Sequence, residues 1–522
     1  MTSTGLQPKR GMILPSESSL TRRAMTGAGW LIAWRMVSRA LGFLSTLVLA
    51  RLLVPADFGL VAMATTFAGA MDSLSQLSVE DMLLRRVEDD TRLHDAAFTL
   101  QVARAVLTGG LIAAGAPIAA EWFHEPRLVP VLLVLGGLSA IGGFENIGLV
   151  AFRRQLRFDA QFRLSLIPRL LQVLATVGIA WEWHTYWALL AGMAVTRLAR
   201  LVMTYVLHPY RPRFGLRGWR ELAGFSGWLW ATGLVRLVWD RYDQFLIGPV
   251  FGAASMGLFQ VARAVAWLPV TELLSPASDV LLAGFSARQR EGNRTTPASA
   301  PLGVAAMMLL TPLILIMSGG AGDVVRVMLG SSIGWQPAIP LVAIFALVCF
   351  PSPLFHVARA AMIARGLVRQ EFVAMVFATG VRVGVIWFAV RGYSLSVVAS
   401  AAVGCAILEC GLFCIQLGRS GALGVRQVGG ASFRLALAAA VTAIALWRTG
   451  LGWTAIRGEE SLGVALDRLA LLGLGAFGLF WGCLVLLWWA AKRPQGPERI
   501  LVMLLNQGAF LLRARFKRIL RA

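Results

Sequence analysis

Long apolar runs separated by short polar stretches dominate this chain from residue 27 to residue 491. Fourteen runs can be delimited, and all but one are clearly long enough to cross a hydrocarbon core of roughly 30 Å as a helix. They lie at 27–53, 58–78, 95–123, 128–152, 164–183, 186–208, 225–251, 256–285, 301–319, 337–357, 372–390, 395–417, 433–446 and 469–491. The exception is the thirteenth, which is short and interrupted by Arg448. The pattern predicts an all-α, polytopic integral membrane protein with about 14 transmembrane helices.

The composition supports this class. Of 522 residues, 57% are hydrophobic and 15% are charged, whereas ordinary soluble domains have roughly 45–50% and about 25%. Residues 1–26 are polar and basic and lack the apolar core and cleavage site of a secretory signal, so we expect a cytoplasmic N-terminal tail.

The net charge of +22 would ordinarily suggest a nucleic-acid partner. Here the arginines cluster in short segments between apolar runs, as in cytoplasmic loops that face anionic lipid, and no nucleic acid is expected as a partner. With the N-terminus inside, the inner segments carry 33 Lys and Arg residues and the outer segments carry 7. This bias predicts that both termini are cytoplasmic.

The chain contains an internal repeat. Residues 29–64 align without a gap on residues 227–262, with matches that include Trp30 with Trp228 and Gly59 with Gly257. Six helices separate the copies, so the two halves share one orientation and form two parallel six-helix lobes.

This repeat predicts the domain organisation. We expect an N-lobe at 27–208, a basic cytoplasmic linker at 209–224 and a C-lobe at 225–418. Two additional helices follow at 433–491, and a basic amphipathic cytoplasmic tail occupies 492–522.

Nine further arginines, counted in neither the inner nor the outer segments, lie within the apolar runs. Each would cost about 2.5–3.5 kcal/mol at the bilayer centre, so most must face inward or reach an interface. Arg35 and Arg39 share one face of the first helix with Gly42, about 40° apart by helical geometry, and have no carboxylate within a turn. In the seventh run, Arg236 can pair with Asp240 one turn on, which would leave Asp243 available.

An apolar-walled cavity that holds several guanidinium groups suits a phosphorylated substrate, because each planar fork can bind phosphate oxygens in two places. The candidate substrate-binding residues are Arg35, Arg39, Arg104, Arg169, Arg236 and Arg263. The candidate coupling or ion-pair residues are Asp240, Asp243 and Glu272. Further inward candidates are Arg382, Glu145 and Asp279, with Asp72 and Glu409 as weaker ones. The alternative is that all of these form internal ion pairs that fix helix packing.

Signals of an enzyme are weak. The five histidines have no metal-ligand spacing, the five cysteines lie in apolar runs, and there is no glycine-rich phosphate loop with its lysine. We therefore predict no enzymatic activity, no metal and no cofactor.

Two short segments carry a resemblance to a known family. Residues 49–60 read Leu-Ala-Arg-Leu-Leu-Val-Pro-Ala-Asp-Phe-Gly-Leu, and residues 243–248 read Asp-Gln-Phe-Leu-Ile-Gly, followed by Gly-Leu-Phe at 257–259. Together with the helix count and the repeat, they resemble oligosaccharide flippases of the Wzx type. That family belongs to the multidrug/oligosaccharidyl-lipid/polysaccharide exporter superfamily.

The resemblance implies a two-lobed bundle in the bacterial inner membrane. It would move undecaprenyl-diphosphate-linked oligosaccharide repeat units to the outer leaflet by alternating access, for exopolysaccharide or lipopolysaccharide biosynthesis. Arg35 and Arg39 are the positions that best fit the cavity arginines thought to hold the diphosphate. The last two helices would guide the lipid tail, although the short thirteenth run departs from that pattern.

The implied partners are the lipid-linked oligosaccharide, membrane lipids, and a polysaccharide polymerase with its export machinery. Energy could come from proton or sodium coupling through Asp240, Asp243 or Glu272, or from the membrane potential. Two alternative functions stay open. A small-molecule exporter of the same superfamily would favour a cavity rich in carboxylates, and a membrane polysaccharide polymerase or ligase would need a sizeable extracytoplasmic loop.

Overall fold

The computed structural model describes residues 44–75, 91–154, 158–217, 226–271, 299–330, 333–419, 425–453 and 461–492, with positions 37, 38, 41, 42, 83, 494, 497 and 498. These residues form helices and contain no strand. Residues 44–52 are helical, and the elements that follow are α2 (Pro55–Leu74), α4 (Thr91–Trp122), α5 (Leu128–Gly142), η1 (Ile147–Leu149), α6 (Val150–Arg154), α7 (Phe158–Trp183), α8 (Trp187–Leu207), α10 (Ser226–Ala266), α12 (Ser299–Gly319), α13 (Ala321–Leu329), η3 (Ile333–Trp335), α14 (Ala338–Val348), α15 (Ser352–Ala364), α16 (Val368–Gly392), α17 (Leu395–Arg419), α18 (Val425–Arg448) and α19 (Leu462–Ala490).

The all-α membrane architecture predicted from the apolar runs is confirmed. Among the described residues, nine helices are long and apolar enough to cross a membrane, or ten if the bent pair α14 and α15 is one span. Each of the fourteen predicted runs overlaps a helix in this part of the chain. The number of membrane crossings stays a prediction, and the predicted amphipathic tail helix at 499–521 lies outside the described residues.

The fourth helix of each half is broken, which the apolar pattern did not predict. In the first half, α5 ends at Gly142, and a short 3-10 turn at Ile147–Leu149 leads into α6. In the second half, α14 and α15 meet at a bend of 40°. Pro351 lies at this bend and has no N–H to continue the helical hydrogen bonds.

The two runs predicted as separate helices, 225–251 and 256–285, correspond to two helices that meet at a kink at Gly252 within α10. The backbone of Gly252 has φ 76° and ψ 178°, a conformation that only glycine adopts readily. Gly252 therefore divides α10 into two helical arms.

The thirteenth helix corrects an expectation. It runs from Val425 to Arg448 over 24 residues, so it is not short, and Arg448 is its last residue rather than an interruption. The nine-residue α13 lies between the predicted runs 301–319 and 337–357, in a stretch with no predicted helix. It buries Val324, Val325 and Leu329 on one face.

The chain groups into two compact units. The first comprises Met1–Leu49, Ala68–Ala116 and Val129–Gly233, and the second comprises Ala50–Phe67, Pro117–Leu128 and Leu234–Ala522. Two short segments of the first repeat thus belong to the unit that contains the second repeat. The predicted lobe boundaries at 27–208 and 225–418 stay a prediction.

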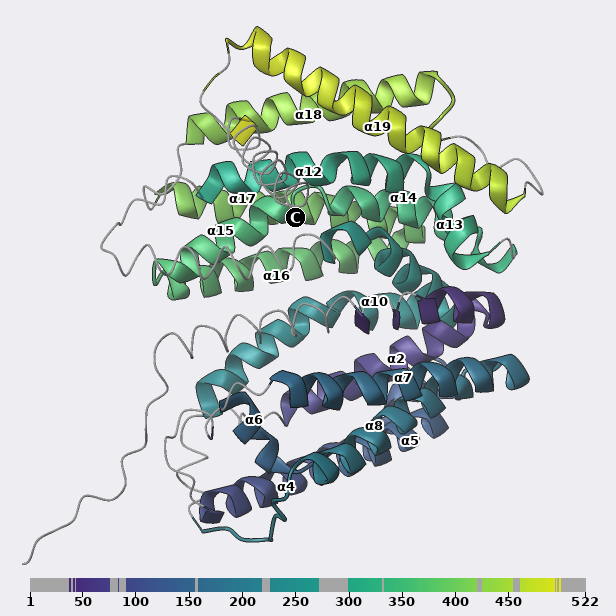
Figure 1. The fold of residues 1–522 in the computed structure, drawn as a ribbon, viewed down its shortest axis with the longest axis vertical. Helices are drawn as coiled ribbons and strands as arrows, with labels where there is room; N and C mark the ends of the chain where they lie inside the picture. Colours follow the sequence, from purple (N-terminus) through teal and green to yellow (C-terminus); the bar gives the residue numbers. More distant parts are fainter. Residues whose placement is uncertain are drawn as a thin grey trace, which may run out of the picture. The chain divides into compact units, whose positions relative to one another are not determined.

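The second unit includes the last two helices, α18 and α19, which pack together on α12 (Figure 1). Met308 of α12, Leu435 of α18 and Phe480 of α19 meet in one buried cluster. The pair is tied down further by Arg468 of α19, whose guanidinium lies 3.5 Å from the carboxylate of Asp323 in α13.

The motif at 49–60 shapes the start of α2. Pro55 is the first residue of the helix and Asp57 lies in its first turn, where a fixed φ and a negative charge both favour a helix start. The Val54 N–H lies 3.4 Å from the Asp57 carboxylate.

Gly59 of α2 then packs against the second arm of α10. A Cβ atom at Gly59 would overlap the carbonyl oxygen of Ala253, and a Cβ atom at Gly257 would overlap the carbonyl oxygen of Pro55. The repeat-related glycines thus let two repeat-related helices touch backbone to backbone.

Candidate functional site

The first unit holds a guanidinium group against the first helix. Arg169 lies in α7 directly after Pro168. Its Nη2 atom is 2.7 Å from the position that a Cβ of Gly42 would occupy. Gly42 is on the helix face predicted to carry Arg35 and Arg39, and these two arginines lie outside the described residues.

Arg169 has a neutral partner. Its Nη1 atom donates to the Gln172 side-chain oxygen at 2.8 Å, and its buried Nε has no hydrogen-bond partner in the described part of the chain. No carboxylate of the described residues pairs with it. Arg169 therefore carries a positive charge that no carboxylate of the described residues offsets, and a buried N–H donor that no described acceptor uses.

Arg104 of α4 is partly neutralised. Its Nη1 atom lies 3.3 Å from the carboxylate of Asp72 in α2, and Asp72 is exposed. The pair is consistent with the alternative, stated from the sequence, that some intramembrane charges only fix helix packing.

Arg263 and Asp243 form an ion pair across the break in α10. Asp243 is buried and also accepts a hydrogen bond from the Gln244 N–H at 2.9 Å. Arg263 additionally donates to the Gln260 side-chain oxygen at 3.0 Å. The expectation that Asp243 would be left available is wrong, because Arg263 in the second arm of α10 pairs with it.

The other candidates of the seventh run, and Glu272 of the eighth, are only partly described. Arg236 lies within α10, but its side chain is outside the described residues. Asp240 is exposed on the same helix, and Glu272 lies outside the described residues. The expected pairing of Arg236 with Asp240 stays a prediction.

A second buried ion pair lies in the second unit. Arg382 of α16 is 3.7 Å from Glu409 of α17, and their side chains are only 16% and 8% exposed. The Arg382 guanidinium also lies over the rings of Trp239 and Tyr242, at 5.4 Å and 5.5 Å from the ring centroids. Arg382 Nε and Glu409 Oε1 are buried without a hydrogen-bond partner in the described part of the chain.

The sequence named Arg382 and Glu409 as inward candidates but did not pair them. One signal could have done so. Helices α16 and α17 are joined by a short turn, so they form an antiparallel hairpin. Arg382 and Glu409 lie at comparable distances from that turn, and such positions face each other.

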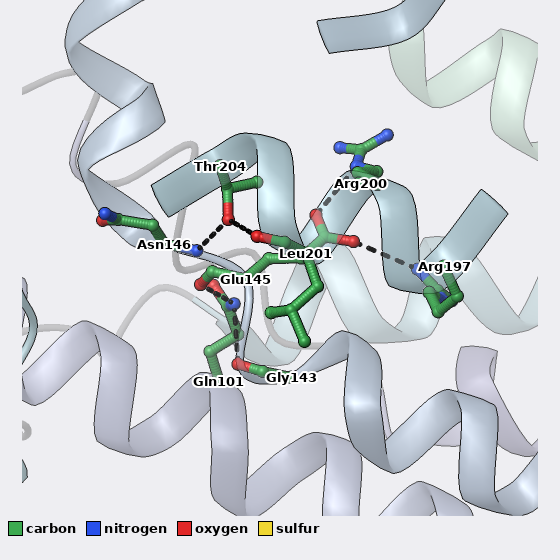
Figure 2. A network of polar contacts seen from close by, with 8 residues as sticks. All are labelled: Gln101, Gly143, Glu145, Asn146, Arg197, Arg200, Leu201 and Thr204. Atoms are coloured by element: carbon green, nitrogen blue, oxygen red, sulfur yellow. Dashed lines mark hydrogen bonds and ion pairs between the residues drawn. The ribbon is translucent and has the colours of Figure 1, made fainter. Parts of the chain in front are cut away.

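Glu145 lies where the fourth helix breaks, and Figure 2 shows its surroundings. Its carboxylate accepts from Arg200 Nε at 2.8 Å and from Arg197 Nη1 at 3.5 Å, both on α8. The Gln101 amide donates to the carbonyl oxygens of Gly143 and Glu145 at 3.0 Å and 3.1 Å. Side chains thus satisfy the carbonyls freed by the break, as membrane-embedded backbone requires.

The described residues offer little for metal or acid–base chemistry. No group of three or more His, Cys, Asp or Glu side chains among them could hold a metal ion. What this part of the chain does contain is isolated or paired guanidinium groups inside helical units.

The apolar helices and the charges placed among them define a multi-pass membrane protein. A family model described as "Polysaccharide biosynthesis protein" matches residues 48–340, more than half of the chain. The chain belongs to this polysaccharide biosynthesis protein family, which confirms the resemblance drawn from residues 49–60 and 243–259.

Curated relatives agree with this assignment. The chain is 25% identical over 327 residues to the succinoglycan biosynthesis transport protein ExoT of Rhizobium meliloti (strain 1021), an alignment that covers 61% of this chain and 65% of ExoT, slightly under two thirds of that relative's length. It is 20% identical to the lipopolysaccharide biosynthesis protein WzxC of Escherichia coli (strain K12), over 63% of this chain and 68% of WzxC.

The fold is similar to that of a solved membrane transporter. The structure of the lipid II flippase MurJ in an inward closed conformation superimposes with a TM-score of 0.67, covering 87% of this chain and 99% of MurJ at 12% identity. At this identity the likeness establishes the fold alone.

Proposed function

We propose that this protein moves undecaprenyl-diphosphate-linked oligosaccharide repeat units from the inner to the outer leaflet of the bacterial cytoplasmic membrane by alternating access. The product would serve exopolysaccharide or lipopolysaccharide assembly. The observation that carries this proposal is Arg169, a guanidinium inside a helical unit that has no carboxylate partner among the described residues. Such a group is costly in a membrane protein unless it binds an anion.

The glycan explains why a protein is needed. A sugar chain carries many hydroxyl groups, and each unpaired polar group loses several kcal/mol of hydration in hydrocarbon, on the order of the values measured for transfer into apolar solvents. A wet passage lined by a helical unit removes that barrier while the prenyl chain stays in lipid. Arg169 would hold the diphosphate together with Arg35 and Arg39 of the first helix.

Residues of the second unit suit a gate. Gly59 of α2 and Gly257 of α10 let these helices meet without intervening side chains. Thr66 of α2 and Gln244 of α10 are joined by a buried hydrogen bond, and the indole N–H of Trp335 donates to the Ala50 carbonyl at 2.7 Å. In the proposed orientation, with both termini cytoplasmic, these contacts close the outer side and must separate for release.

Energy coupling would act through the buried ion pairs. Protonation of a carboxylate, or its capture by a sodium ion, would release the arginine that it holds. Asp243 with Arg263 and Glu409 with Arg382 are the candidate pairs. Asp240 and Glu272, proposed from the sequence, stay candidates for the same role.

The proposal is tested in a strain that lacks this gene and any paralogue. We expect lipid-linked repeat units to accumulate on the cytoplasmic leaflet, where a membrane-impermeant glycan label cannot reach them in intact spheroplasts. Normal surface glycan in that strain would refute the proposal. Increased drug sensitivity with normal glycan would favour a small-molecule exporter, and glycan extension by the purified protein would favour a polymerase.

The site is tested by complementation with Arg169→Ala and Arg169→Lys at matched protein levels. Arg127→Ala is the control, because Arg127 lies on the loop between α4 and α5 and, unlike Arg169, pairs with a carboxylate, that of Glu125 at 2.8 Å. We expect Arg169→Ala to fail, Arg169→Lys to complement in part and Arg127→Ala to complement fully.

A further inference from the structure

The end of α8 and the chain that follows it carry a concentration of positive charge. Arg197 and Arg200 lie on the helix, and Arg211, Arg213 and Arg217 follow within the next ten residues. All five are exposed. The predicted topology places this region at the cytoplasmic face of the membrane.

Nearby carboxylates leave most of this charge uncompensated. Arg197 and Arg200 share one carboxylate, that of Glu145, and Arg200 uses only its Nε atom for it. Arg211 donates to the carbonyls of His208 and Tyr210, which are uncharged. The guanidinium groups therefore retain N–H donors that point to no partner in the described part of the chain.

Apolar and aromatic side chains are exposed in the same region. Val202 and Val206 on α8 are 60% and 72% exposed, and Phe214 and Leu216 in the following segment are 68% and 57% exposed. The Tyr205 hydroxyl donates to the Phe144 carbonyl at 2.9 Å, and the Arg211 guanidinium lies 5.6 Å from the Tyr205 ring centroid. Aromatic rings beside arginines at the end of a spanning helix are typical of the membrane–water interface.

The segment after α8 is fixed to α4. The Tyr210 hydroxyl and the Arg213 N–H both donate to the carboxylate of Asp95, and the Gly215 N–H donates to the Thr99 hydroxyl at 2.8 Å. Burial and the bond to Asp95 raise the pKa of the Tyr210 hydroxyl, so it stays a donor at neutral pH. The exposed Phe214 and the arginines around it thus belong to a built surface.

From this combination we infer that residues 197–217 form a binding surface for an anionic phospholipid of the inner leaflet. Its phosphate lies among the exposed guanidinium groups of this surface, those of Arg213 and Arg217 included, and its acyl chains lie along the stripe of Val202 and Val206. The surface differs from the proposed substrate site at Arg169, and the inference rests on the proposed function only for its orientation, with α8 ending at the cytoplasmic face.

The experiment measures binding of fluorescent phosphatidylglycerol and phosphatidylcholine to the purified full-length protein in a neutral detergent. The variant is Arg213→Ala with Arg217→Ala, because neither side chain takes part in a hydrogen bond within the described residues. A charge near a membrane surface contributes about 1 kcal/mol per arginine, about fivefold in affinity. We expect phosphatidylglycerol to bind about 25-fold more weakly to the double variant and phosphatidylcholine binding to stay unchanged.

The matched control is Arg391→Ala. Arg391 lies in the last turn of α16 and stacks on Trp387 at 4.1 Å, so it is an arginine beside an aromatic ring outside the proposed surface. Three results would each overturn the inference. They are equal binding of the two lipids to the wild type, unchanged phosphatidylglycerol binding by the double variant, and an equal loss of binding in Arg391→Ala. Binding of inorganic phosphate without binding of phosphatidylglycerol would overturn it as well.

The outcome is separable from that of the proposed function. In one outcome, the double variant Arg213→Ala with Arg217→Ala loses phosphatidylglycerol binding while deletion of the gene leaves surface glycan normal. That pair of results supports the lipid surface and refutes the flippase. The reverse result, equal lipid binding with glycan lost on deletion, refutes the surface and leaves the flippase intact.

Discussion

The fifth helix of each half carries an arginine inside the membrane-spanning part, and the two arginines have opposite surroundings. In the first half, Arg169 of α7 meets Gly42 of the first helix and the neutral amide of Gln172. In the second half, Arg382 of α16 meets the carboxylate of Glu409 and two aromatic rings. One repeat therefore keeps its positive charge, and the other neutralises it.

The comparison shows that an arginine in an apolar run does not define a function by itself. Its neighbours decide whether the guanidinium is a packing element or an anion receptor. Gly42 matters here because the absence of a side chain lets the guanidinium of Arg169 reach the first helix. In the second half, the Arg382 guanidinium lies instead over the rings of Trp239 and Tyr242 of α10.

The largest effect is expected where the charge is neutralised. Glu409→Ala leaves Arg382 buried without its counter-charge, and breaking a buried ion pair in this way costs about 3–5 kcal/mol. We expect a strong loss of folded protein in a detergent thermal-shift measurement. The double variant Arg382→Met with Glu409→Leu should recover most of the stability, and a single variant as stable as the wild type would show that Arg382 is not held by Glu409.

The next effect tests the half that keeps its charge. Arg169→Ala should lower the rate of lipid-linked oligosaccharide translocation in proteoliposomes about 100-fold, because a charge-assisted hydrogen bond to the diphosphate contributes about 1.5–3 kcal/mol. Protein stability should change little, since the residue has no charged partner among the described residues. If Arg169→Ala instead destabilised the fold as much as Glu409→Ala, the two halves would not differ as proposed.

A smaller effect is expected where the halves are alike. Gly59 and Gly257 are related by the repeat and each faces a backbone carbonyl, so Gly59→Ala and Gly257→Ala should have similar consequences. Each added methyl group forces the two backbones apart at a cost of about 1–3 kcal/mol. The measurement is the rate of thiol labelling of a cysteine introduced by Ala50→Cys. We expect this rate to rise in both variants to a similar extent. An increase in only one variant would show that the two glycines are not equivalent in the contact.

The smallest effect is expected at Gly42. In Gly42→Ala the new methyl group meets the end of a flexible side chain, so the Arg169 guanidinium shifts rather than the backbone. We expect translocation to fall by about tenfold or less, equivalent to one weakened hydrogen bond. Unchanged thermal stability is the control, and translocation equal to that of the wild type would separate Arg169 from the first helix.

Much of the architecture could be predicted from the sequence because membrane spans carry a strong signal in length and apolarity. The repeat pairing of Gly59 with Gly257, found by alignment alone, corresponds to an actual helix–helix contact. The break after Gly142 could not be predicted, because the Gln101 side chain satisfies the freed carbonyls from another helix. A hydropathy profile does not detect such hydrogen bonds between side chains and backbone carbonyls. The break before Ser352 does have a signal in the sequence, Pro351.

The charged residues were harder to interpret than the helices. Arg169, Arg263 and Asp243 were all named as candidates, but the sequence could not tell which of them would be paired. Asp243 was expected to be available because helical spacing within the seventh run predicts a pairing of Arg236 with Asp240 and no partner for Asp243. Its partner, Arg263, lies 20 residues further on and comes into reach because the chain turns at Gly252.

The turn at Gly252 joins the two helical arms of α10 through a single residue. The Asp243–Arg263 ion pair connects one arm to the other across that turn. While the ion pair is intact, it restrains the angle between the two arms. Without that ion pair, the angle between the arms would depend on Gly252 and on the packing of the second arm against α2. Under the proposed coupling, the release of Arg263 from Asp243 is expected to change the angle between the two arms.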